Sequence, residues 1–406
     1  MSIPDQTMNA SVTVSQSGVA VLNTDTKRGH IHRVANGGDL GAKIGQSFDF
    51  PTIYTTSSIP VDFDPSQFLI QERLEGTILR IWLAVQPDGT LKLYASTHKI
   101  PDISEGGSWG ARSFHKAASQ FVYPKLKLEN MAPGAVYIVL LQDTENKMGC
   151  KCENGGVHLA TLVNDETSPC GFTRVERDIG LPKPNEHTFS TRQELVDALN
   201  ELDSQVVGER SVAGFVALSK NPQDMSTINL ISDGYDAVIE ARNNEPHLMK
   251  RVSELWDQAH NKGLSVEIQV TAREHLQTLN LLFPEYAEVF ADDFANRLHD
   301  CVTMLNDLYK RRHIQNEIIE LPKPVHFFMM SLRNRHVESR RRAKADPSQR
   351  VFYASYNTIM SSLQHIPICE AIKIMDWTTE WKTRLAAAAA VAGSQSMPDR
   401  WQGKVV

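Results

Sequence analysis

Between residues 19 and 239, much of the chain consists of short runs in which apolar and polar residues alternate, with glycine and proline between them. Such alternation is typical of half-buried β-strands. Residues 77–84 and 90–95 alternate on either side of the turn sequence QPDG at residues 86–89, which predicts a β-hairpin. The first half of the chain is therefore expected to be rich in strands.

Near residue 245 the apolar spacing changes to intervals of three and four, which are typical of helices. Between residues 284 and 313, one expected helix face consists of Tyr286, Val289, Phe290, Phe294, Leu298, Val302, Leu305 and Leu308. The alanine run at residues 386–390 favours a last helix that ends at Gly393. Together these patterns predict an α+β fold, with a strand-rich first half followed by an all-helical C-terminal domain.

We expect four parts along the chain. Residues 1–20 are rich in serine, threonine and asparagine without a sustained period, which predicts a flexible N-terminal arm. A strand-rich domain over residues 21–245 and a helical domain over residues 246–385 should follow. Residues 386–406 are expected to form a C-terminal tail.

Composition narrows the class of protein. The 406 residues are 41% hydrophobic and 22% charged, as in ordinary globular proteins with room for two domains. A net charge of −6 argues against a protein whose whole surface coats nucleic acid, but it leaves room for a local basic patch. Five scattered cysteines, an N-terminus unlike a signal peptide and no apolar run of about 20 residues favour a soluble protein of the cytoplasm or nucleus without a membrane span.

The polar sequence ERLEGT at residues 72–77 stands between two alternating runs, and further distinctive stretches occur before and after it in a fixed order. These are KRGHIHRV (27–34), GQSFDF (45–50), LYASTHKI (93–100), SWGARSF (108–114), VYIVLLQDTENKMGC (136–150), HLATLVNDET (158–167) and SVAGFVALS (211–219). Over roughly residues 20–245 this series resembles the covalent nucleotidyltransferase superfamily, and within it the phage-type and viral RNA-ligase-like proteins. The resemblance implies a nucleotidyltransferase domain built of packed antiparallel sheets.

In that family a lysine attacks the α-phosphate of ATP, and two acidic residues and a pair of lysines assist, as the resemblance implies. Here the nucleophile position is Arg73, whose guanidinium keeps its proton at neutral pH and offers no free amine. The acidic positions fall on Leu140 and Ala213. The lysine pair, expected on a strand within residues 236–244, is reduced to Arg242. We therefore expect a retained fold with a dismantled site, with no catalytic residue and no cofactor.

The residues that remain at this degenerate pocket allow more than one interpretation. We favour an ion pair between Arg73 and Glu75 that fills the old pocket, and the alternative is a nucleotide that still binds without reacting. Gly76 and Thr77 are expected to serve the turn. Lys99 is the nearest lysine and the candidate for a substitute nucleophile, in which case ATP and Mg²⁺ would be the cofactors.

Two clusters outside these motifs have both a structural and a functional interpretation. Cys150, Cys152, His158 and Cys170 suggest zinc, but their spacing is not that of a standard zinc site, and we predict buried cysteines and no metal. Residues 333–350 are basic, and their candidate nucleic-acid-binding residues are Arg333, Arg335, Arg340, Arg341, Arg342 and Lys344. A solvated helix face or a contact with an acidic protein explains the same residues equally well.

The leading hypothesis is a catalytically inactive RNA-ligase-like protein that is a structural or binding component of a larger assembly, with other proteins as partners. Large DNA viruses carry ligase-like proteins with similar stretches, which extends the hypothesis to a virus particle or its host cell. The alternatives are an active ATP-dependent polynucleotide ligase with an atypical nucleophile and a non-catalytic protein that binds RNA or DNA through residues 333–350.

Overall fold

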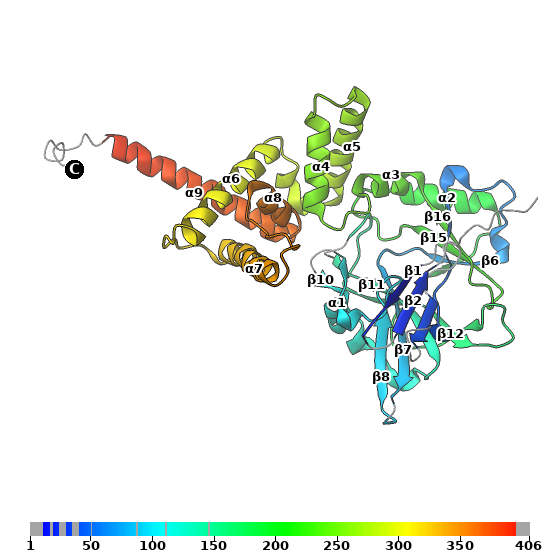
Figure 1. Ribbon diagram of the computed structural model, residues 1–406. Helices are drawn as coiled ribbons and strands as arrows, with labels where there is room; N and C mark the ends of the chain where they lie inside the picture. Colours follow the sequence, from blue (N-terminus) through cyan, green and yellow to red (C-terminus); the bar gives the residue numbers. More distant parts are fainter. Residues whose placement is uncertain are drawn as a thin grey trace, which may run out of the picture. The chain divides into compact units, whose positions relative to one another are not determined.

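The structure is a computed structural model. It describes residues 11–16, 19–23, 30–34, 40–49, 51–86, 88–109, 112–144 and 147–394. The chain divides between Pro246 and His247 into two compact units, which are described separately below. In the described residues unit 1 combines antiparallel sheets with a few helices, and unit 2 is helical (Figure 1). The α+β class predicted from the sequence is confirmed.

Two sheets of unit 1 pack against each other. The first has the order β1-β2-β3-β4, formed by β1 (Ser11–Val14), β2 (Val19–Asn23), β3 (His30–Val34) and β4 (Leu40–Gly45). The second has the order β13-β12-β11-β7-β8, formed by β7 (Thr77–Val85), β8 (Leu91–Ser96), β11 (Ala135–Gln142), β12 (Gly155–Asn164) and β13 (Phe172–Val175). All neighbouring strands in both sheets are antiparallel, and β7 and β8 form the predicted hairpin.

A third sheet carries the segment that precedes the ERLEGT motif. Its order is β14-β6-β15-β16-β5, formed by β5 (Thr52–Thr55), β6 (Phe68–Glu72), β14 (Glu186–His187), β15 (Gly214–Ser219) and β16 (Thr227–Ile231). The pair β16–β5 is parallel, and the other pairs of this sheet are antiparallel. A short ladder joins β9 (Ser108–Trp109) to β10 (Arg112–Ser113). Because β6 belongs to the third sheet and β7 to the second, the motif connects the two sheets.

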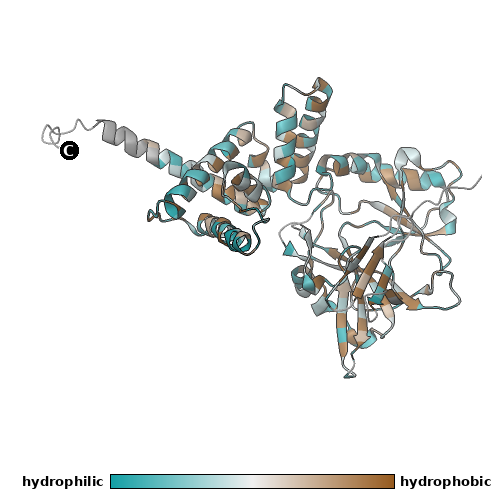
Figure 2. Ribbon diagram, in the orientation of Figure 1, coloured by the Kyte–Doolittle hydropathy of each residue, from teal (hydrophilic) through white to brown (hydrophobic). Residues whose placement is uncertain are grey.

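The second sheet is apolar on both faces, so its central strands β7 and β11 are apolar at nearly every position. One face packs on α1 (Phe114–Phe121) through Leu79, Ile81, Tyr137 and Val139. The other face packs on the first sheet through Trp82, Val136, Ile138, Val19 and Ile31. Figure 2 shows the corresponding brown positions along the strands of unit 1. Successive residues of a strand point to opposite faces, so this sheet requires apolar residues at nearly every position.

Two further helices lie against the third sheet and at its end. Helix α2 (Arg192–Asp203) buries Leu195 and Leu199 in the core that includes Phe215 of β15. Helix α3 (Asp233–Arg242) follows β16 and begins at Ser232, whose hydroxyl accepts a hydrogen bond from the Tyr235 amide. An oxygen at this cap position satisfies an amide that the first helical turn cannot pair.

Unit 2 consists of helices in the part that the structure describes. They are α4 (Leu248–His260), α5 (Val266–Leu282), the 3₁₀ segment η7 (Pro284–Val289), α6 (Phe294–His313), α7 (Lys323–Ala345), α8 (Tyr356–Gln364) and α9 (Ile368–Ser394). Within this unit α6 contacts α8 and α9, and α4 contacts α5. The sequence predicted one helix face from Tyr286 onward, whereas the α-helix begins only at Phe294, after the 3₁₀ turn that Pro284 opens. No helix among the described residues combines the length and the apolar character that crossing a membrane requires.

Three expected boundaries differ from the elements observed. Strand β1 lies within the segment predicted as an arm, of which residues 1–10 are outside the described residues. Residues 236–244, predicted as a strand, belong mostly to α3, because Ser232 caps a helix whose first turn carries Asp233 and Asp236. Helix α9 continues through the start of the predicted tail to Ser394.

Candidate functional site

A pocket of about 860 Å³ lies in unit 1 where the ERLEGT motif passes between the second and third sheets. Five of the seven predicted pocket residues line it, namely Arg73, Glu75, Gly76, Thr77 and Lys99, and so does Leu140. Ala213 and Arg242 are not among its lining residues. The volume lies within the range of small-molecule sites, so the pocket is open and has not been filled by its own side chains.

Arg73 lies at the junction of β6 and β15. Its backbone amide donates to the Gly214 carbonyl at 2.8 Å, and the Ala213 amide donates to the Arg73 carbonyl at 2.8 Å. Residues 73 and 213 are therefore neighbours across β6 and β15. The guanidinium carbon of Arg73 lies 5.2 Å from the centroid of the Tyr235 ring, within the range of cation–π contacts. Its Nη1 atom is shielded from solvent and has no hydrogen-bond partner among the described residues.

Glu75 is 7% exposed and is held by four donors. Its carboxylate accepts hydrogen bonds from the backbone amides of Met148, Gly149 and Cys150 at 2.8–3.2 Å. The Tyr235 hydroxyl donates to Oε1 at 2.6 Å. No ion pair joins Arg73 to Glu75 in the described residues, so the predicted pair that fills the pocket is wrong. The amides and the phenol satisfy the carboxylate, and the guanidinium rests on the aromatic ring instead.

Two glycines lie beside this carboxylate at positions where a Cβ would be crowded. Gly76 has a φ of +156°, and a Cβ there would lie 2.5 Å from the Leu141 carbonyl oxygen. At Gly149 a Cβ would lie 3.0 Å from the Tyr235 ring and 3.2 Å from Glu75 Oε1. The motif glycine thus permits the turn into β7, and the second glycine lets the loop amides approach the carboxylate.

Tyr235 keeps its proton in this setting. Burial raises the pKa of its phenol, the positive charge of Arg73 opposes that rise, and the Glu75 carboxylate adds to it. Burial likewise raises the pKa of the Cys150 thiol, and Glu75 contributes in the same direction. The phenol therefore remains a donor to Glu75, and the Cys150 thiol remains protonated at neutral pH.

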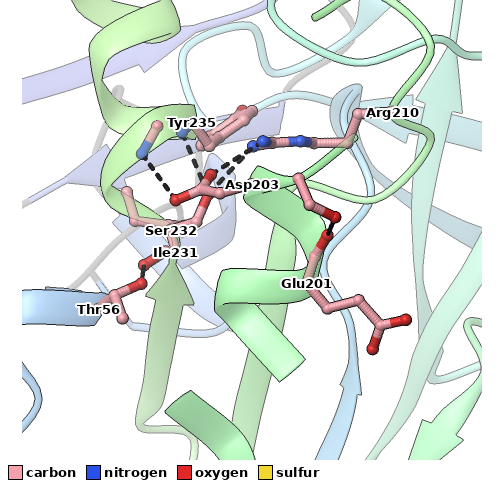
Figure 3. Close-up of polar contacts among 9 residues, drawn as sticks. Thr56, Glu201, Asp203, Arg210, Ile231, Ser232 and Tyr235 are labelled. Carbon is pink, nitrogen blue, oxygen red and sulfur yellow. Dashed lines mark hydrogen bonds and ion pairs between the residues drawn. The ribbon is translucent and has the colours of Figure 1, made fainter. Parts of the chain in front are cut away.

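A polar network fixes the start of α3 and with it the position of Tyr235 (Figure 3). The Asp203 carboxylate accepts from Arg210 Nη2 at 2.9 Å and from the Gly234 amide at 3.1 Å. Arg210 Nη1 donates to the Ser232 hydroxyl at 3.0 Å, and that hydroxyl caps the Tyr235 amide. The buried guanidinium of Arg210 thus joins the end of α2 to the start of α3. Helix α3 carries Tyr235, on whose ring Arg73 rests.

Other charged residues of the pocket were not predicted from the sequence. Arg112 Nη1 and the Asp143 carboxylate form an ion pair at 3.2 Å, and Lys147 lies just before the amides that bind Glu75. Lys99, in contrast, was predicted; it is exposed, and its backbone amide donates to Thr97 Oγ1 at 3.3 Å. Asp143 and Lys147 follow the end of β11, a place where sheet proteins often carry polar site residues, and this position was the available signal.

The remaining motif positions carry no charge toward the pocket. Leu140 lines it with an alkyl chain, and Ala213 is buried against Cys150, Ile231 and Tyr235. The strand that follows β15 is β16, not residues 236–244, and its pocket residues are the neutral Thr227 and Asn229. Arg242 is 1% exposed and donates to the backbone carbonyls of Glu245 and Pro246.

These residues do not fit ATP and Mg²⁺ as reactants in lysyl-AMP formation. The nucleophile position carries no amine, and two motif acids are apolar. Four carboxylates line the pocket, those of Asp49, Glu72, Glu75 and Asp143. Glu75 is surrounded by donors, Asp143 is paired with Arg112, and Glu72 accepts a hydrogen bond from the Asn185 amide group. We derive no step of nucleotidyl transfer through this pocket.

The cysteine cluster lies in several different surroundings. Cys150 belongs to a small apolar cluster beside α3, and the Cys170 thiol donates to the Phe172 carbonyl at 3.1 Å. His158 Nε2 contacts Thr161 Oγ1 at 3.0 Å, and Cys152 lines the pocket. Burial raises the pKa of the Cys152 thiol to about 11, with Glu75 adding to the effect. Across the described residues, no group of three or more histidine, cysteine or acidic side chains is placed to hold a metal ion.

The predicted nucleic-acid-binding residues lie in unit 2, on α7. All six are exposed, but they differ in their partners. Arg335 donates to Ser362 Oγ at 2.9 Å and its guanidinium carbon lies 4.4 Å from the Phe352 ring centroid. Arg342 pairs with Glu338 at 3.0 Å. Arg333, Arg340, Arg341 and Lys344 form no ion pair with the described residues.

Comparison with known proteins gives structural likenesses alone. Neither a family model nor a curated protein matches the chain. Among solved structures, it is similar to an archaeal ATP-dependent RNA ligase in two forms. Form 2 has a TM-score of 0.42 and 11% identity over 73% of this chain and 76% of that one. Form 1 has a TM-score of 0.41 and 10% identity over 72% and 76%. Likenesses of this degree carry no argument about activity.

Proposed function

We propose that the chain is an RNA-ligase-like protein that does not transfer nucleotides and acts by binding, as a component of a larger assembly. The order of its motifs supports the ligase-like domain, and the chemistry of the pocket supports the absence of catalysis. A place in a virus particle is part of the proposal only through the family resemblance. The partners in such an assembly would be other proteins.

The observation that carries the proposal is the setting of Arg73. A nucleophile for ATP must be a neutral amine aimed into the pocket, and here a guanidinium lies on the face of Tyr235. The carboxylate two residues later is committed to three loop amides and a phenol. The motif therefore has a structural use, because it ties the loop at residues 148–150 and α3 to the two sheets.

A second candidate is an active enzyme that uses another lysine. It is kept because Lys99 and Lys147 both line the pocket. Burial and neighbouring cations are what activate a lysine amine as a nucleophile, and Lys99 is exposed to solvent. This candidate requires that one of these two lysines become covalently labelled by a nucleotide.

One experiment separates the two. The full chain is incubated with α-labelled ATP, and separately with GTP, with Mg²⁺ or Mn²⁺, and analysed by denaturing gel and mass spectrometry. The proposal expects no covalent label. Label that is lost in Lys99→Arg or in Lys147→Arg would establish the enzyme and identify its nucleophile.

The pocket also has a feature that favours a ligand held without reaction. Arg73 Nη1 is buried and has no partner in the described residues, and unsatisfied buried donors are costly. An anionic ligand such as a nucleotide would satisfy it. The measurement is the melting temperature of the unlabelled protein with and without ATP, compared with Arg73→Gln. A rise in wild type that disappears in the variant identifies non-covalent binding, and equal melting curves leave the pocket with its structural role.

A further inference from the structure

Positive charge is concentrated in one part of unit 2. Residues 1–246 carry 21 basic and 30 acidic residues, a net charge of −9, whereas residues 247–406 carry 21 and 18, a net charge of +3. Residues 310–350 alone contain eleven lysines and arginines and four acids, a net charge of +7. The weak positive charge of unit 2 is therefore due to the segment that spans the end of α6 and all of α7.

The cations of α7 form a row along the helix. Arg333, Val337, Arg340 and Lys344 follow one another at intervals of four, three and four residues, which places them on one side of the helix. The row covers about 16 Å of helix axis at 1.5 Å per residue. The three charged members are exposed and form no ion pair with the described residues. Figure 2 shows α7 as largely hydrophilic along its later turns.

The end of α6 adds cations beside this row. Burial is the main cause that lowers the pKa of the His313 imidazole, and the nearby Arg333, Arg312 and His326 lower it further. No acidic group contributes to that shift. His313 Nε2 is shielded from solvent and has no hydrogen-bond partner among the described residues. Arg311, at the end of α6, is paired with Asp307 and Glu317, so the cations that the end of α6 brings to His313 and Arg333 are those of Arg312 and its neighbours on α7.

We propose that the end of α6 and the Arg333–Arg340–Lys344 row of α7 form a surface that binds the phosphate backbone of a nucleic acid. Arginine and lysine side chains neutralise phosphates and release the counterions condensed on them. A row of about 16 Å lies alongside roughly nine phosphates of a duplex, which is enough to contact each of the three cations. The surface makes no direct use of the pocket in unit 1.

The chemistry of the surface favours nucleic acid over an acidic protein. Protein interfaces have an apolar centre that is depleted in charge, whereas nucleic-acid interfaces are strongly positive throughout. Charged side chains predominate on this face, and Val337 is its apolar member, at 58% exposed. The proposal therefore concerns backbone binding without preference for a base sequence.

The test uses the full chain and fluorescently labelled 30-nucleotide RNA and DNA, single-stranded and duplex, with affinity measured from 50 to 300 mM salt. The variant is the triple substitution Arg333→Gln, Arg340→Gln and Lys344→Gln. The matched control removes three exposed cations elsewhere in unit 2, Lys262→Gln, Lys373→Gln and Arg384→Gln, so both variants have the same net charge. Circular dichroism establishes that both variants are folded.

We expect wild type and control to bind at least one of these nucleic acids, with affinity that falls steeply with salt. The row variant should lose about tenfold or more in affinity at low salt, and its slope of log affinity against log salt should be smaller by about two to three. Equal loss in both variants, salt-insensitive binding, or no binding of any nucleic acid would overturn the proposal. Stronger binding to poly-glutamate than to nucleic acid would overturn it in favour of an acidic protein partner. Covalent labelling by ATP affects neither outcome, so the two proposals fail separately.

Discussion

The guanidinium of Arg73 lies 5.2 Å from the ring centroid of Tyr235, and the hydroxyl of the same tyrosine donates to Glu75. One aromatic residue of α3 thereby contacts two of the three charged residues of the ERLEGT motif. The two charges are separated by a polarised ring and are not paired with each other. The hydrogen bond joins residues 160 positions apart in the sequence. The predictions about the motif depend on these two contacts of Tyr235.

Replacement of Tyr235 by phenylalanine tests the hydroxyl alone. Tyr235→Phe keeps the ring beneath Arg73 but removes one of the four donors to a buried carboxylate. We expect the free energy of unfolding to fall by about 1–3 kcal/mol, measured by urea denaturation at pH 7. The control is Tyr353→Phe, at a tyrosine that is 64% exposed, and it should leave stability unchanged. Equal stability of Tyr235→Phe and wild type would mean that the loop amides suffice for Glu75.

Restoring a lysine at the nucleophile position tests how far the site has been dismantled. Arg73→Lys should not form a covalent adduct with labelled ATP, because Leu140 and Ala213 supply no carboxylate and Thr227 and Asn229 supply no positive charge. The measurement is intact-protein mass spectrometry after incubation with ATP and Mg²⁺. Detection of an AMP adduct on residue 73 would show that the assignment of Leu140 and Ala213 to the acidic positions is wrong.

The sequence predicted the elements with a strong local signal. The hairpin of β7 and β8 and the change to helical spacing near residue 245 follow from periodicity, since burial sets the period directly. The resemblance correctly assigned Arg73, Ala213 and Leu140 to positions in or next to the pocket. Motif positions on short, regular strands can be counted along the sequence. The resemblance failed at residues 236–244, where the apolar run at residues 237–239 was assigned to a strand but belongs to the helix that Ser232 caps.

The contacts that decide the chemistry of the site depend on residues far apart in the chain. The four donors to Glu75 come from the loop at residues 148–150 and from α3, and three of them are backbone amides, which leave no mark in a sequence. Two charges two residues apart therefore suggested an ion pair. The actual partner of Arg73 is the ring of Tyr235, and only the three-dimensional position of α3 reveals this contact.

The turn glycine gives a prediction about stability. Gly76→Ala places a Cβ 2.5 Å from the Leu141 carbonyl oxygen at a φ of +156°, so the backbone must shift. We expect a loss of about 2–4 kcal/mol in the free energy of unfolding, measured by denaturant titration. Gly155→Ala is the matched control, because a Cβ there meets nothing closer than 3.9 Å and should cost little. A Gly76→Ala protein as stable as the control would contradict the turn geometry.

The buried imidazole of His158 predicts how stability depends on pH. Burial, aided by the charge of Lys183, lowers the pKa of His158 to about 4, from an ordinary value of 6.5. Between these values the unfolded chain binds a proton that the folded protein does not, so the free energy of unfolding falls as pH decreases from 6.5 to 4. The full effect corresponds to roughly 3 kcal/mol. Above pH 6.5 the group makes no pH-dependent contribution, because it is neutral in both states.

His158→Gln removes this proton while keeping a side chain that can contact Thr161, the hydrogen-bond partner of the imidazole at 3.0 Å. Urea denaturation at pH 4.5, 5.5, 6.5 and 7.5 should show a shallower loss of stability on acidification in the variant than in wild type. His115→Gln, at an exposed position of α1, should keep the wild-type profile. Parallel profiles for wild type and His158→Gln would mean that other groups account for any acid sensitivity. If only His158→Gln has a shallower profile, the loss of stability on acidification is due to His158, which is buried on β12 of the second sheet.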